Sequence, residues 1–333
     1  MTITDEQGLS VAEFRDITSA IENEVGNIMV GQREVVREVL ICIIAGGHAL
    51  LEGVPGLGKT LLVRTFANSL HLKFNRIQFT PDLMPADITG TNILVESEAG
   101  ERSFAFQPGP IFSNLVLADE INRATPKTQA ALLESMQDRT CSVAGVIHPM
   151  LEPFFVLATQ NPIEMEGTYP LPEAQLDRFL FKLIVSYPSE TDLTEILRIT
   201  TADIETRATP VADGHQIVRL GKLARQVPIA SSVTDYVVRL VMATHPENTR
   251  ATEGVKRYVR FGVSPRGAQA IVLGSKIRAL MEGRLNVAFD DIRAVALPAL
   301  RHRIILNFEA ESSGVSTDDV LISLLAEVPE SSV

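Results

Sequence analysis

One eight-residue segment, GVPGLGKT at residues 53–60, limits the possible folds of this chain more than any other feature. It matches the whole pattern G-x-x-x-x-G-K-[ST], a phosphate-binding loop that joins a strand to a helix. The surroundings fit, because a short apolar run precedes the loop and Leu62, Phe66 and Leu70 follow it at four-residue spacing. The alternative is a glycine-rich turn without a ligand, and the combined context argues against it. The segment therefore predicts an α/β nucleotide-binding fold.

Each part of the loop has a predicted role in binding ATP or ADP. Glycines let the backbone wrap closely around an anion, and the helix amino terminus adds unpaired N–H groups and a favourable dipole. Lys59 is expected to reach the β- and γ-phosphates, and the Thr60 hydroxyl to bind Mg²⁺. The residues predicted to contact the nucleotide here are Gly53, Val54, Pro55, Gly56, Leu57, Gly58, Lys59 and Thr60.

Short apolar runs recur along the first half of the chain and predict strands, each bounded by turn or capping residues. Helical patterns separate most of them, so we expect a parallel five-stranded sheet covered by helices. Two further helices are expected before the sheet, over roughly 1–30 and 32–46. The expected strands are His48–Leu51, Phe74–Phe79, Asn114–Ala118, Phe154–Ala158 and Phe181–Tyr187.

Strand patterns fade after Pro188, and helical stripes replace them. We therefore predict two domains, an α/β nucleotide-binding domain over residues 1–188 and a small all-α lid domain over residues 189–333. The stripes expected to form lid helices lie at residues 190–206, 214–226, 231–244, 265–282, 290–300 and 316–326.

Two adjacent carboxylates, Asp119 and Glu120, end the apolar strand that begins at Asn114. In α/β folds, ligands bind at the carboxyl ends of the strands. We expect Asp119 to hold Mg²⁺ through water and Glu120 to activate the attacking water as a general base. A solvated strand end is the alternative for such a pair taken alone, but its position downstream of a phosphate loop favours the functional interpretation.

The strand Phe154–Ala158 runs into Thr159, Gln160, Asn161 and Pro162. A polar amide just beyond a central strand can orient the attacking water or sense the γ-phosphate, and we expect this of Asn161. The alternative is that Asn161 simply forms a turn before the proline.

Taken together, these motifs and several further segments make the sequence resemble the AAA+ superfamily, and more closely its MoxR branch. The matching segments follow the family's order over roughly residues 25–305. They are GVPGLGKT at 53–60, LADEINRATPKTQAALLESMQ at 117–137, ATQNP at 158–162, YPLPEAQLDRF at 169–179, SPRGAQA at 264–270 and LPALRHRI at 297–304.

The resemblance implies further site residues. Arg178 looks like the arginine finger, which in this family type reaches the γ-phosphate bound by a neighbouring subunit and so requires a ring, usually a hexamer. The alternative for Arg178 is a salt bridge with Asp177 or Glu173. Arg266 looks like the second sensor, carried on the lid with Ser264 as helix cap; an ordinary surface arginine is its alternative.

Three more segments match this branch less specifically. Val30 and Gly31 resemble the segment that packs against adenine, although an ordinary helix entry is the alternative. Residues 88–112 and 139–152 resemble hairpin insertions, the first pairing Ile93–Val95 with Ser103–Phe106 and the second turning near Ala144 and Gly145. Such hairpins touch substrates in related motors, and decorative surface hairpins are the alternative.

Charge bears on the choice between function classes. The formal net charge is −11 and the chain has no basic block, whereas proteins that grip nucleic acid concentrate positive charge. The expected hairpin at 88–112 carries Glu96, Glu98 and Glu101 against one Arg102. The six histidines are scattered, which argues against a structural zinc or copper site. These observations favour a protein-remodelling ATPase over a nucleic-acid motor, with a metal-chelatase-type motor subunit as a third possibility.

The remaining expectations concern partners and location. MoxR-type proteins are thought to remodel or mature protein complexes, often beside partners carrying von Willebrand factor A domains, so such a partner is implied here. The sequence contains no apolar run near the ~20 residues that span a bilayer. Its polar first residues do not resemble a secretory signal, and Cys42 and Cys141 suit a reducing compartment. We therefore expect a cytoplasmic protein that reaches membranes only through a partner.

Overall fold

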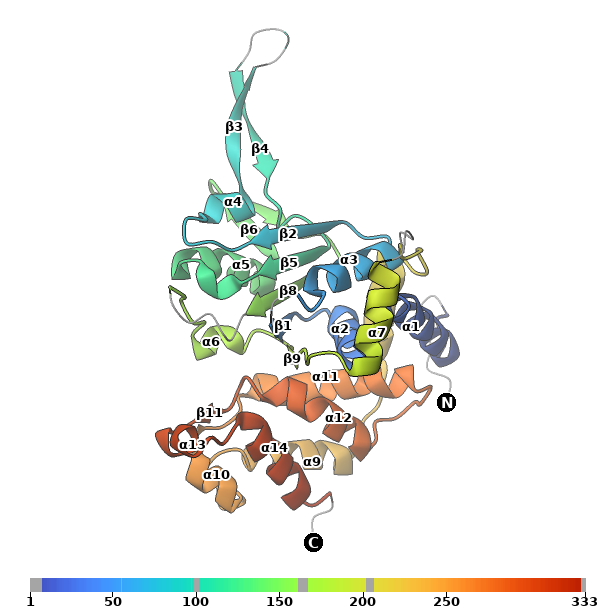
Figure 1. Cartoon of the computed structure of the whole chain (residues 1–333), viewed down its shortest axis with the longest axis vertical. Coiled ribbons are helices and arrows are strands. Elements are labelled where there is room, and N and C mark those ends of the chain that lie inside the picture. Colours follow the sequence, from blue (N-terminus) through green and yellow to red (C-terminus); the bar gives the residue numbers. More distant parts are fainter. Residues whose placement is uncertain are drawn as a thin grey trace.

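A five-stranded parallel sheet with strand order β2-β5-β8-β1-β9 forms the centre of the computed structural model (Figure 1). The structure describes residues 8–54, 56–96, 98, 102–160, 167–201 and 207–330. The strands are β1 (Ala49–Glu52), β2 (Phe74–Gln78), β5 (Leu115–Asp119), β8 (Phe155–Gln160) and β9 (Phe181–Ile184). All four neighbouring pairs are parallel, which confirms the predicted fold class.

Helices bury both faces of the sheet. On one face, a large apolar cluster joins Leu51, Leu117 and Leu157 to α1 (Val11–Gly26), α2 (Arg33–Ala45) and α3 (Lys59–Ser69). On the other face, alternate strand residues such as Leu50 and Val116 pack with α5 (Pro126–Asp138). Side chains on a strand alternate between faces, so covering both faces requires nearly continuous apolar strands. This is why the central strands appear in the sequence as short unbroken apolar runs.

The strand positions agree with the sequence expectations to within one or two residues, except at β9. The expected strand Phe181–Tyr187 ends at Ile184. β9 is the outermost strand of the sheet and, among the described strands, pairs only with β1, which ends opposite it at Glu52 before the chain turns into the phosphate loop. Without a partner strand beyond that point, the ladder stops.

A helical region lies against the sheet at the end where β1 and β9 begin (Figure 1). It contains the short strands β10 (Val259–Phe261) and β11 (Ile305–Leu306), an antiparallel pair that the sequence analysis did not predict. Its helices are α8 (Gly214–Gln226), α9 (Ser231–Met242), α10 (Glu253–Tyr258), α11 (Pro265–Met281), α12 (Phe289–Leu300), α13 (Phe308–Ser313) and α14 (Thr317–Glu327). α7 (Glu190–Thr200) lies apart from them and packs against the segment at Gly31.

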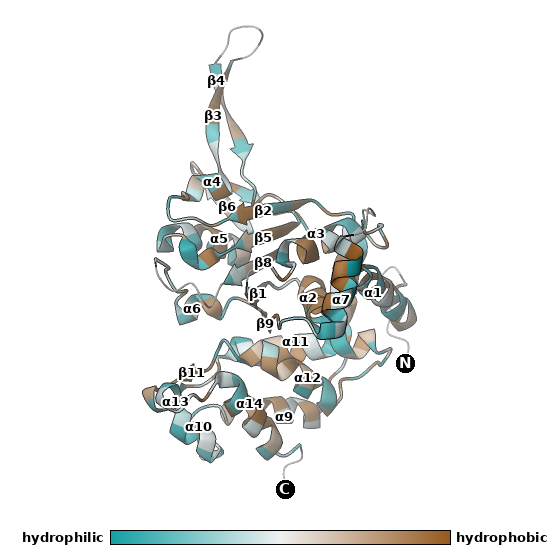
Figure 2. Ribbon diagram, in the orientation of Figure 1, coloured by the Kyte–Doolittle hydropathy of each residue, from teal (hydrophilic) through white to brown (hydrophobic). Residues whose placement is uncertain are grey.

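The helical region and the sheet share one hydrophobic cluster. The cluster that includes α1 and α2 continues through α8, α9, α11, α12 and α14, and α11 packs directly on α1 and α2. Figure 2 shows apolar residues, in brown, on both α2 and α11, which pack against each other. The division into domains at residue 188 stays a prediction. Cys42 and Cys141 are both buried and free of disulfide bonds, as expected for small core residues.

Both expected hairpins are confirmed. β3 (Gly90–Glu96) pairs antiparallel with β4 (Arg102–Pro108). This hairpin follows the short helix α4 (Pro85–Thr89) in the chain and projects from the body of the molecule (Figure 1). β6 (Thr140–Val143) pairs with β7 (Val146–Pro149) through a turn in which both Ala144 and Gly145 have positive φ. Turns of this handedness match the twist of the strands that they join.

Aromatic rings join the two hairpins at their bases. The rings of Phe106 and His148 are stacked with centroids 3.9 Å apart, and Phe112 meets Phe106 edge-on. Among the described residues, no helix has the length and apolar character that crossing a bilayer requires.

His48, at the start of β1, is buried and carries a fixed tautomer. Its Nδ1 accepts a hydrogen bond from the backbone N–H of Val156 at 3.0 Å, so the proton resides on Nε2, which donates to the carbonyl of Met136 at 3.1 Å. Burial disfavours the charged ring and lowers the pKa of His48 to about 4.

This pKa predicts a specific dependence of stability on pH. Between pH 6.5 and 4 the His48 ring is protonated in the unfolded chain and neutral in the folded protein. The free energy of unfolding therefore falls as the pH falls through this range, by about 1.4 kcal/mol per pH unit at most. A His48→Asn variant keeps a hydrogen-bond acceptor near the Nδ1 position and has no ring to titrate. Urea unfolding of both proteins should show wild type more stable at pH 7.5, with the difference shrinking by about 1–3 kcal/mol towards pH 4.5. Because carboxylates titrate in both proteins, a difference that stays constant with pH would contradict the assignment.

Candidate active site

The loop between β1 and α3 has the backbone of a phosphate-binding loop. Gly56 and Gly58 both have positive φ, 86° and 77°, a conformation that glycine adopts at no steric cost. Gly58 is the N-cap of α3 and brings no side chain to cap it, so the first amides of the helix remain available to an anion. Of the predicted loop residues, Pro55 lies outside the described part of the chain.

Lys59 begins α3 and folds back over the loop. Its Nζ donates a hydrogen bond to the carbonyl of Gly53 at 2.5 Å. Burial lowers the pKa of Lys59, while the nearby carboxylates of Asp119, Glu120 and Glu52 act in the opposite direction. The ammonium group therefore lies within the field of the two carboxylates at the end of β5, as a shared phosphate site requires.

Two segments from elsewhere in the chain enclose this loop. A Cβ placed on Gly53 would approach Val185 to 3.1 Å, and one on Gly58 would meet the methyl group of Met29 at 3.5 Å. These two segments are also bonded to each other, because the side-chain amide of Gln32 donates a hydrogen bond to the carbonyl of Ser186 at 3.2 Å.

Gly31 has a φ of 74°, and a Cβ there would lie 2.5 Å from Cγ of Asp192 on α7. Val30 is half-buried beside it. The structure thus brings these two predicted adenine-contacting residues to the same end of the sheet as the phosphate loop. Their contact with the base remains a prediction.

The two acidic residues at the end of β5 share one hydroxyl group, Asp119 through its carboxylate and Glu120 through its backbone N–H. Thr159 Oγ1 donates to Oδ1 of Asp119 at 2.6 Å and accepts from the backbone N–H of Glu120 at 2.8 Å. β8, which carries Thr159, lies between β5 and β1 in the sheet. This hydroxyl therefore fixes the end of β5 relative to the strand that leads into the phosphate loop.

Glu120 is in a strained and tightly oriented conformation. Its φ of 57° lies in the left-handed region that costs free energy for a residue with a side chain. Its Oε2 accepts hydrogen bonds from Gln78 Nε2 and from Arg123 Nη1, both at 2.8 Å. Two side chains, one from β2 and one from the turn after β5, thus meet at the predicted general base.

Four residues that bond Asp119 or Glu120 were not predicted as site residues from the sequence: Gln78, Arg123, Arg76 and Thr159. A usable signal existed for two of them, since Gln78 and Thr159 lie at the ends of strands where ligands gather. Asn161, the predicted sensor amide, lies outside the described residues.

Asp119 and Thr60 offer oxygen atoms that suit magnesium, which in phosphate sites takes one or two protein oxygens together with phosphates and water. Oδ2 of Asp119 accepts a hydrogen bond from Arg76 at 2.6 Å and Oδ1 accepts one from Thr159, so both oxygens already have donors. A contact through an intervening water preserves these bonds. The donor set therefore fits the predicted water-mediated role of Asp119.

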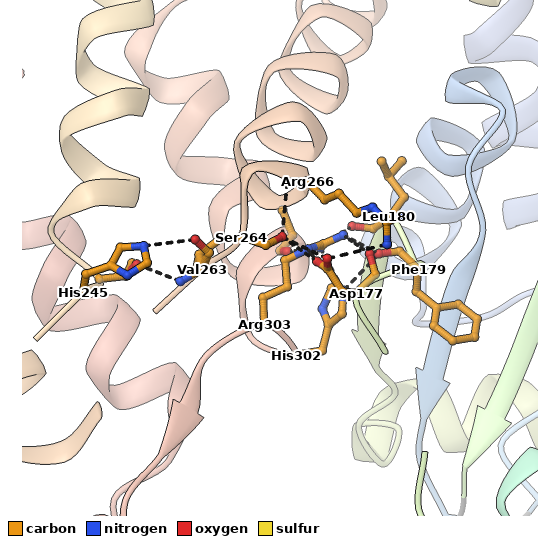
Figure 3. A network of polar contacts seen from close by, with 11 residues as sticks. Asp177, Phe179, Leu180, His245, Val263, Ser264, Arg266, His302 and Arg303 are labelled. Atoms are coloured by element: carbon orange, nitrogen blue, oxygen red, sulfur yellow. Dashed lines mark hydrogen bonds and ion pairs between the residues drawn. The ribbon is translucent and has the colours of Figure 1, made fainter. Parts of the chain in front are cut away.

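Arg178 and Arg266 lie at the opposite edge of the sheet. Arg178 lies three residues before the start of β9, and its Nη1 donates to the carbonyl of Leu133 at 2.8 Å. Arg266 follows Ser264, which caps α11 as expected by accepting from the Arg266 backbone N–H. Asp177 pairs with Arg303 at 2.8 Å and lies 3.8 Å from Arg266 (Figure 3). Four-residue β1 alone separates this edge from the phosphate loop by roughly 13 Å.

Both arginines line an open cavity of about 900 Å³ between the beginnings of β1 and β9 and the helices α9 and α11. Its lining also includes Arg139 and Arg225, whose guanidinium groups bond the carbonyls of Gly46 and Ala45 at the end of α2. Cations are favourable there because helix carbonyls end unpaired. The other cations of the lining are Arg178, Arg266, Lys276 and Arg303. In a chain of net charge −11, this cavity is strongly positive.

Comparison with known proteins gives consistent matches. Residues 48–181 match the model of the ATPase family associated with various cellular activities (AAA), and residues 251–323 match the AAA lid domain. The chain is 44% identical to a protein named Chaperone MoxR1 from Mycobacterium tuberculosis, over 97% of this chain and 84% of the relative. It is 42% identical to the uncharacterized protein YeaC of Bacillus subtilis, over 93% of each. A crystal structure of a candidate ATPase from Cytophaga hutchinsonii superposes with a TM-score of 0.89 at 39% identity, covering 96% of each chain.

The shared hydroxyl of Thr159 can be tested by substitution. Thr159→Val keeps the shape of the fully buried side chain but leaves Oδ1 of Asp119 and the N–H of Glu120 without their partner. We expect kcat for ATP hydrolysis to fall by about 10²-fold because both carboxylates lose their orientation. Thr159→Ser keeps the hydroxyl and should stay within a few-fold of wild type in a steady-state phosphate-release assay. Equal activity of the Val and Ser variants would contradict a role for the hydroxyl.

Proposed function

This chain belongs to the MoxR-type AAA+ ATPases and hydrolyses ATP, and we propose that it does so as a ring of identical subunits that remodels or matures protein complexes. The proposal goes beyond the family assignment in three respects: the shared active site, the hexameric ring usual in this family type, and the protein substrate. The separation of the site residues supports the shared site and the ring, the family type supports the hexamer, and the β3–β4 hairpin supports the protein substrate.

The separation of the predicted site residues between two edges of the sheet carries the proposal of a ring. Lys59 and Glu120 lie at one edge, and Arg178 and Arg266 lie at the other, beside a cavity rich in positive charge. Arginines that stabilise the γ-phosphate must reach it, and these two cannot reach the loop of their own chain. A head-to-tail contact places the positive cavity of one subunit over the phosphate loop of the next, and repetition of that contact closes a ring.

Within such a shared site each residue has a defined task. Lys59 and the loop amides hold the phosphates, and Glu120 accepts a proton from the attacking water, its carboxylate oriented by Gln78 and Arg123. Asn161 is assigned to the orientation of that water. Thr60, and Asp119 through water, would hold Mg²⁺, which would supply neutralisation of the phosphate charge. The neighbour's Arg178 and Arg266 stabilise charge on the γ-phosphate in the transition state.

The projecting β3–β4 hairpin favours a protein substrate. Leu94 and Phe104 face each other across its two strands and are 57% and 76% exposed. Arg102 is paired with Glu96 at 3.3 Å, so its charge is not free for a phosphate backbone. Apolar side chains flanked by carboxylates suit unfolded or loosely packed polypeptide better than nucleic acid. A nucleic-acid motor is the alternative that this hairpin disfavours, and a chelatase-type motor subunit is the third candidate.

Family membership supports two further parts of the proposal. The relative named Chaperone MoxR1 supports a chaperone-like role. The resemblance to the MoxR branch supports a partner protein carrying a von Willebrand factor A domain, through which the ATPase would meet its substrate.

Mixed rings test whether the active site is shared. Arg178→Ala and Glu120→Gln subunits should each be nearly inactive, the first by about 10³-fold if Arg178 is worth what arginine fingers usually contribute. Mixed before assembly, they should recover activity, because an intact Arg178 of one variant meets an intact Glu120 of the other. A matched mixture of Lys59→Ala with Glu120→Gln, which disables every site on the same edge, should recover none. Absence of recovery in the first mixture, with ring size by light scattering unchanged, would contradict the shared site.

Nucleotide-dependent capture tests the substrate class. Glu120→Gln should bind ATP without turning it over and hold its substrate, so capture in ATP is compared with capture in ADP. We expect protein enriched in ATP, and enrichment lost when Phe104→Ser is added. Phe308→Ser, which alters an equally exposed phenylalanine on α13 (81% exposed), serves as the control and should leave capture unchanged. Nucleic acid retained in place of protein would overturn the protein-remodelling role.

A further inference from the structure

A buried polar network joins the start of the lid helix α11 to the segment before β9 (Figure 3). Its centre is Arg303, which follows α12 and whose side chain is only 3% exposed. The guanidinium Nε donates to Oδ1 of Asp177 at 2.8 Å, and Nη2 donates to the carbonyls of Asp177 at 3.1 Å and Phe179 at 2.7 Å. Nη1 donates to the carbonyl of Leu180 at 3.1 Å. One side chain therefore holds three residues on either side of Arg178, namely Asp177, Phe179 and Leu180.

Asp177 connects the same segment to α11. Its two carboxylate oxygens lie 2.9 Å from the hydroxyl of Ser264, which is also the N-cap of α11. Arg266, in the first turn of that helix, approaches Oδ2 of Asp177 to 3.8 Å and remains 49% exposed. The carboxylate thus touches both the arginine that is buried behind it and the cap of the helix that carries the exposed arginine.

The backbone of α11 is shaped to admit Arg303. A Cβ on Gly267 would come within 2.2 Å of Val263 and 3.0 Å of Cδ of Arg303. Only a residue without a side chain lets the arginine lie against the first turn of the helix. Burial lowers the pKa of Arg303, whereas Asp177 raises it, so the pair is held together where neither charge is well solvated.

Stability alone is a weak explanation for such a network. Replacing a buried ion pair by apolar residues of similar volume is often neutral or stabilising, whereas the geometry of a guanidinium fork is specific. The residue enclosed by the network is Arg178, which lies between Asp177 and Phe179 in the held segment. Its own side chain is tied at Nη1 to the carbonyl of Leu133 on α5.

We propose that Arg303, Asp177 and Ser264 form a clamp that positions Arg178 relative to Arg266, so that both arginines reach the neighbouring subunit's nucleotide as one rigid unit. The proposal rests on the shared active site proposed above and adds the device that sets its geometry. Arg303, Asp177 and Ser264 are positioning residues, because they act on the neighbour's nucleotide only through the two arginines. Movement of the lid is transmitted to Arg178 through the same contacts.

Arg303→Lys tests the clamp while keeping its positive charge. Lysine supports the charge of Asp177, but its three N–H donors cannot serve the carboxylate and the three carbonyls at once. We expect kcat for ATP hydrolysis to fall by about 10²-fold, as a displacement of about 1 Å at a catalytic group can cause. The KM for ATP and the affinity for ADP should change by less than about twofold, because the loop at the other edge of the sheet is untouched. A weakened ADP affinity with unchanged kcat would overturn the proposal.

Mixed rings separate positioning from general damage. Arg303→Lys subunits retain Lys59 and Glu120, so mixing them with Glu120→Gln subunits, which retain the clamp and Arg178, should restore activity. Damage confined to the variant's own site would not be repaired by a neighbour. No recovery here, while the Arg178→Ala and Glu120→Gln mixture does recover, overturns the clamp and leaves the shared site intact. No recovery in either mixture overturns the shared site and the clamp with it.

Ser264 provides a milder variant in case Arg303→Lys does not fold. Ser264→Ala removes the hydroxyl from Asp177 and should lower kcat by about tenfold, and Ser264→Thr should restore it to within about twofold. Ser316→Ala removes the comparable cap of α14, where Ser316 accepts from the Asp319 backbone N–H, without touching Asp177. It should lower the melting temperature as Ser264→Ala does and leave kcat unchanged. Equal loss of kcat in the two alanine variants would show that the loss of a helix cap, rather than the clamp, is responsible.

Discussion

Parallel pairing of five strands gives the central sheet two edges of different chemistry. Every strand ends at the same edge, so β1 brings Lys59 and β5 brings Asp119 and Glu120 to one place. Every strand begins at the other edge, and there the segment before β9 brings Arg178. The backbone ladder holds these groups apart, and no rotation of side chains can unite them within one chain. The proposed sharing of active sites between subunits rests on this polarity.

The lid is attached to that second edge by contacts of two kinds. A continuous apolar cluster runs from α1 and α2 into α11 and α12 and supplies the non-directional part of the attachment. The network around Arg303 supplies direction, because each of its hydrogen bonds has a fixed geometry. A lid held by apolar packing alone could slide over α2. Arg303 holds the lid in one orientation relative to the sheet. That orientation sets the position of Arg266, which is exposed.

Several elements could be predicted because their causes are local. The loop at 53–60 is encoded by the spacing of its glycines and Lys59, and the hairpins by alternating residues around turn formers such as Ala144 and Gly145. Ser264 predicted the start of α11, because helix capping depends on only two or three neighbouring residues. The short strands β10 and β11 escaped prediction because they are separated by more than forty residues and pair only after the helices have packed.

The partners of the site residues could not be predicted for the same reason. Gln78 meets Glu120 because β2 lies beside β5, and Arg303 meets Asp177 because α12 packs beneath β9. The sequence by itself determined the chemistry: a phosphate loop and a pair of carboxylates, recognisable from residue type and spacing, and two arginines that only the resemblance to the MoxR branch singled out. Only the tertiary structure decided on which edge of the sheet each group lies, since strand order and helix packing are set by contacts between residues distant in sequence. That placement separates Arg178 and Arg266 from their own phosphate loop.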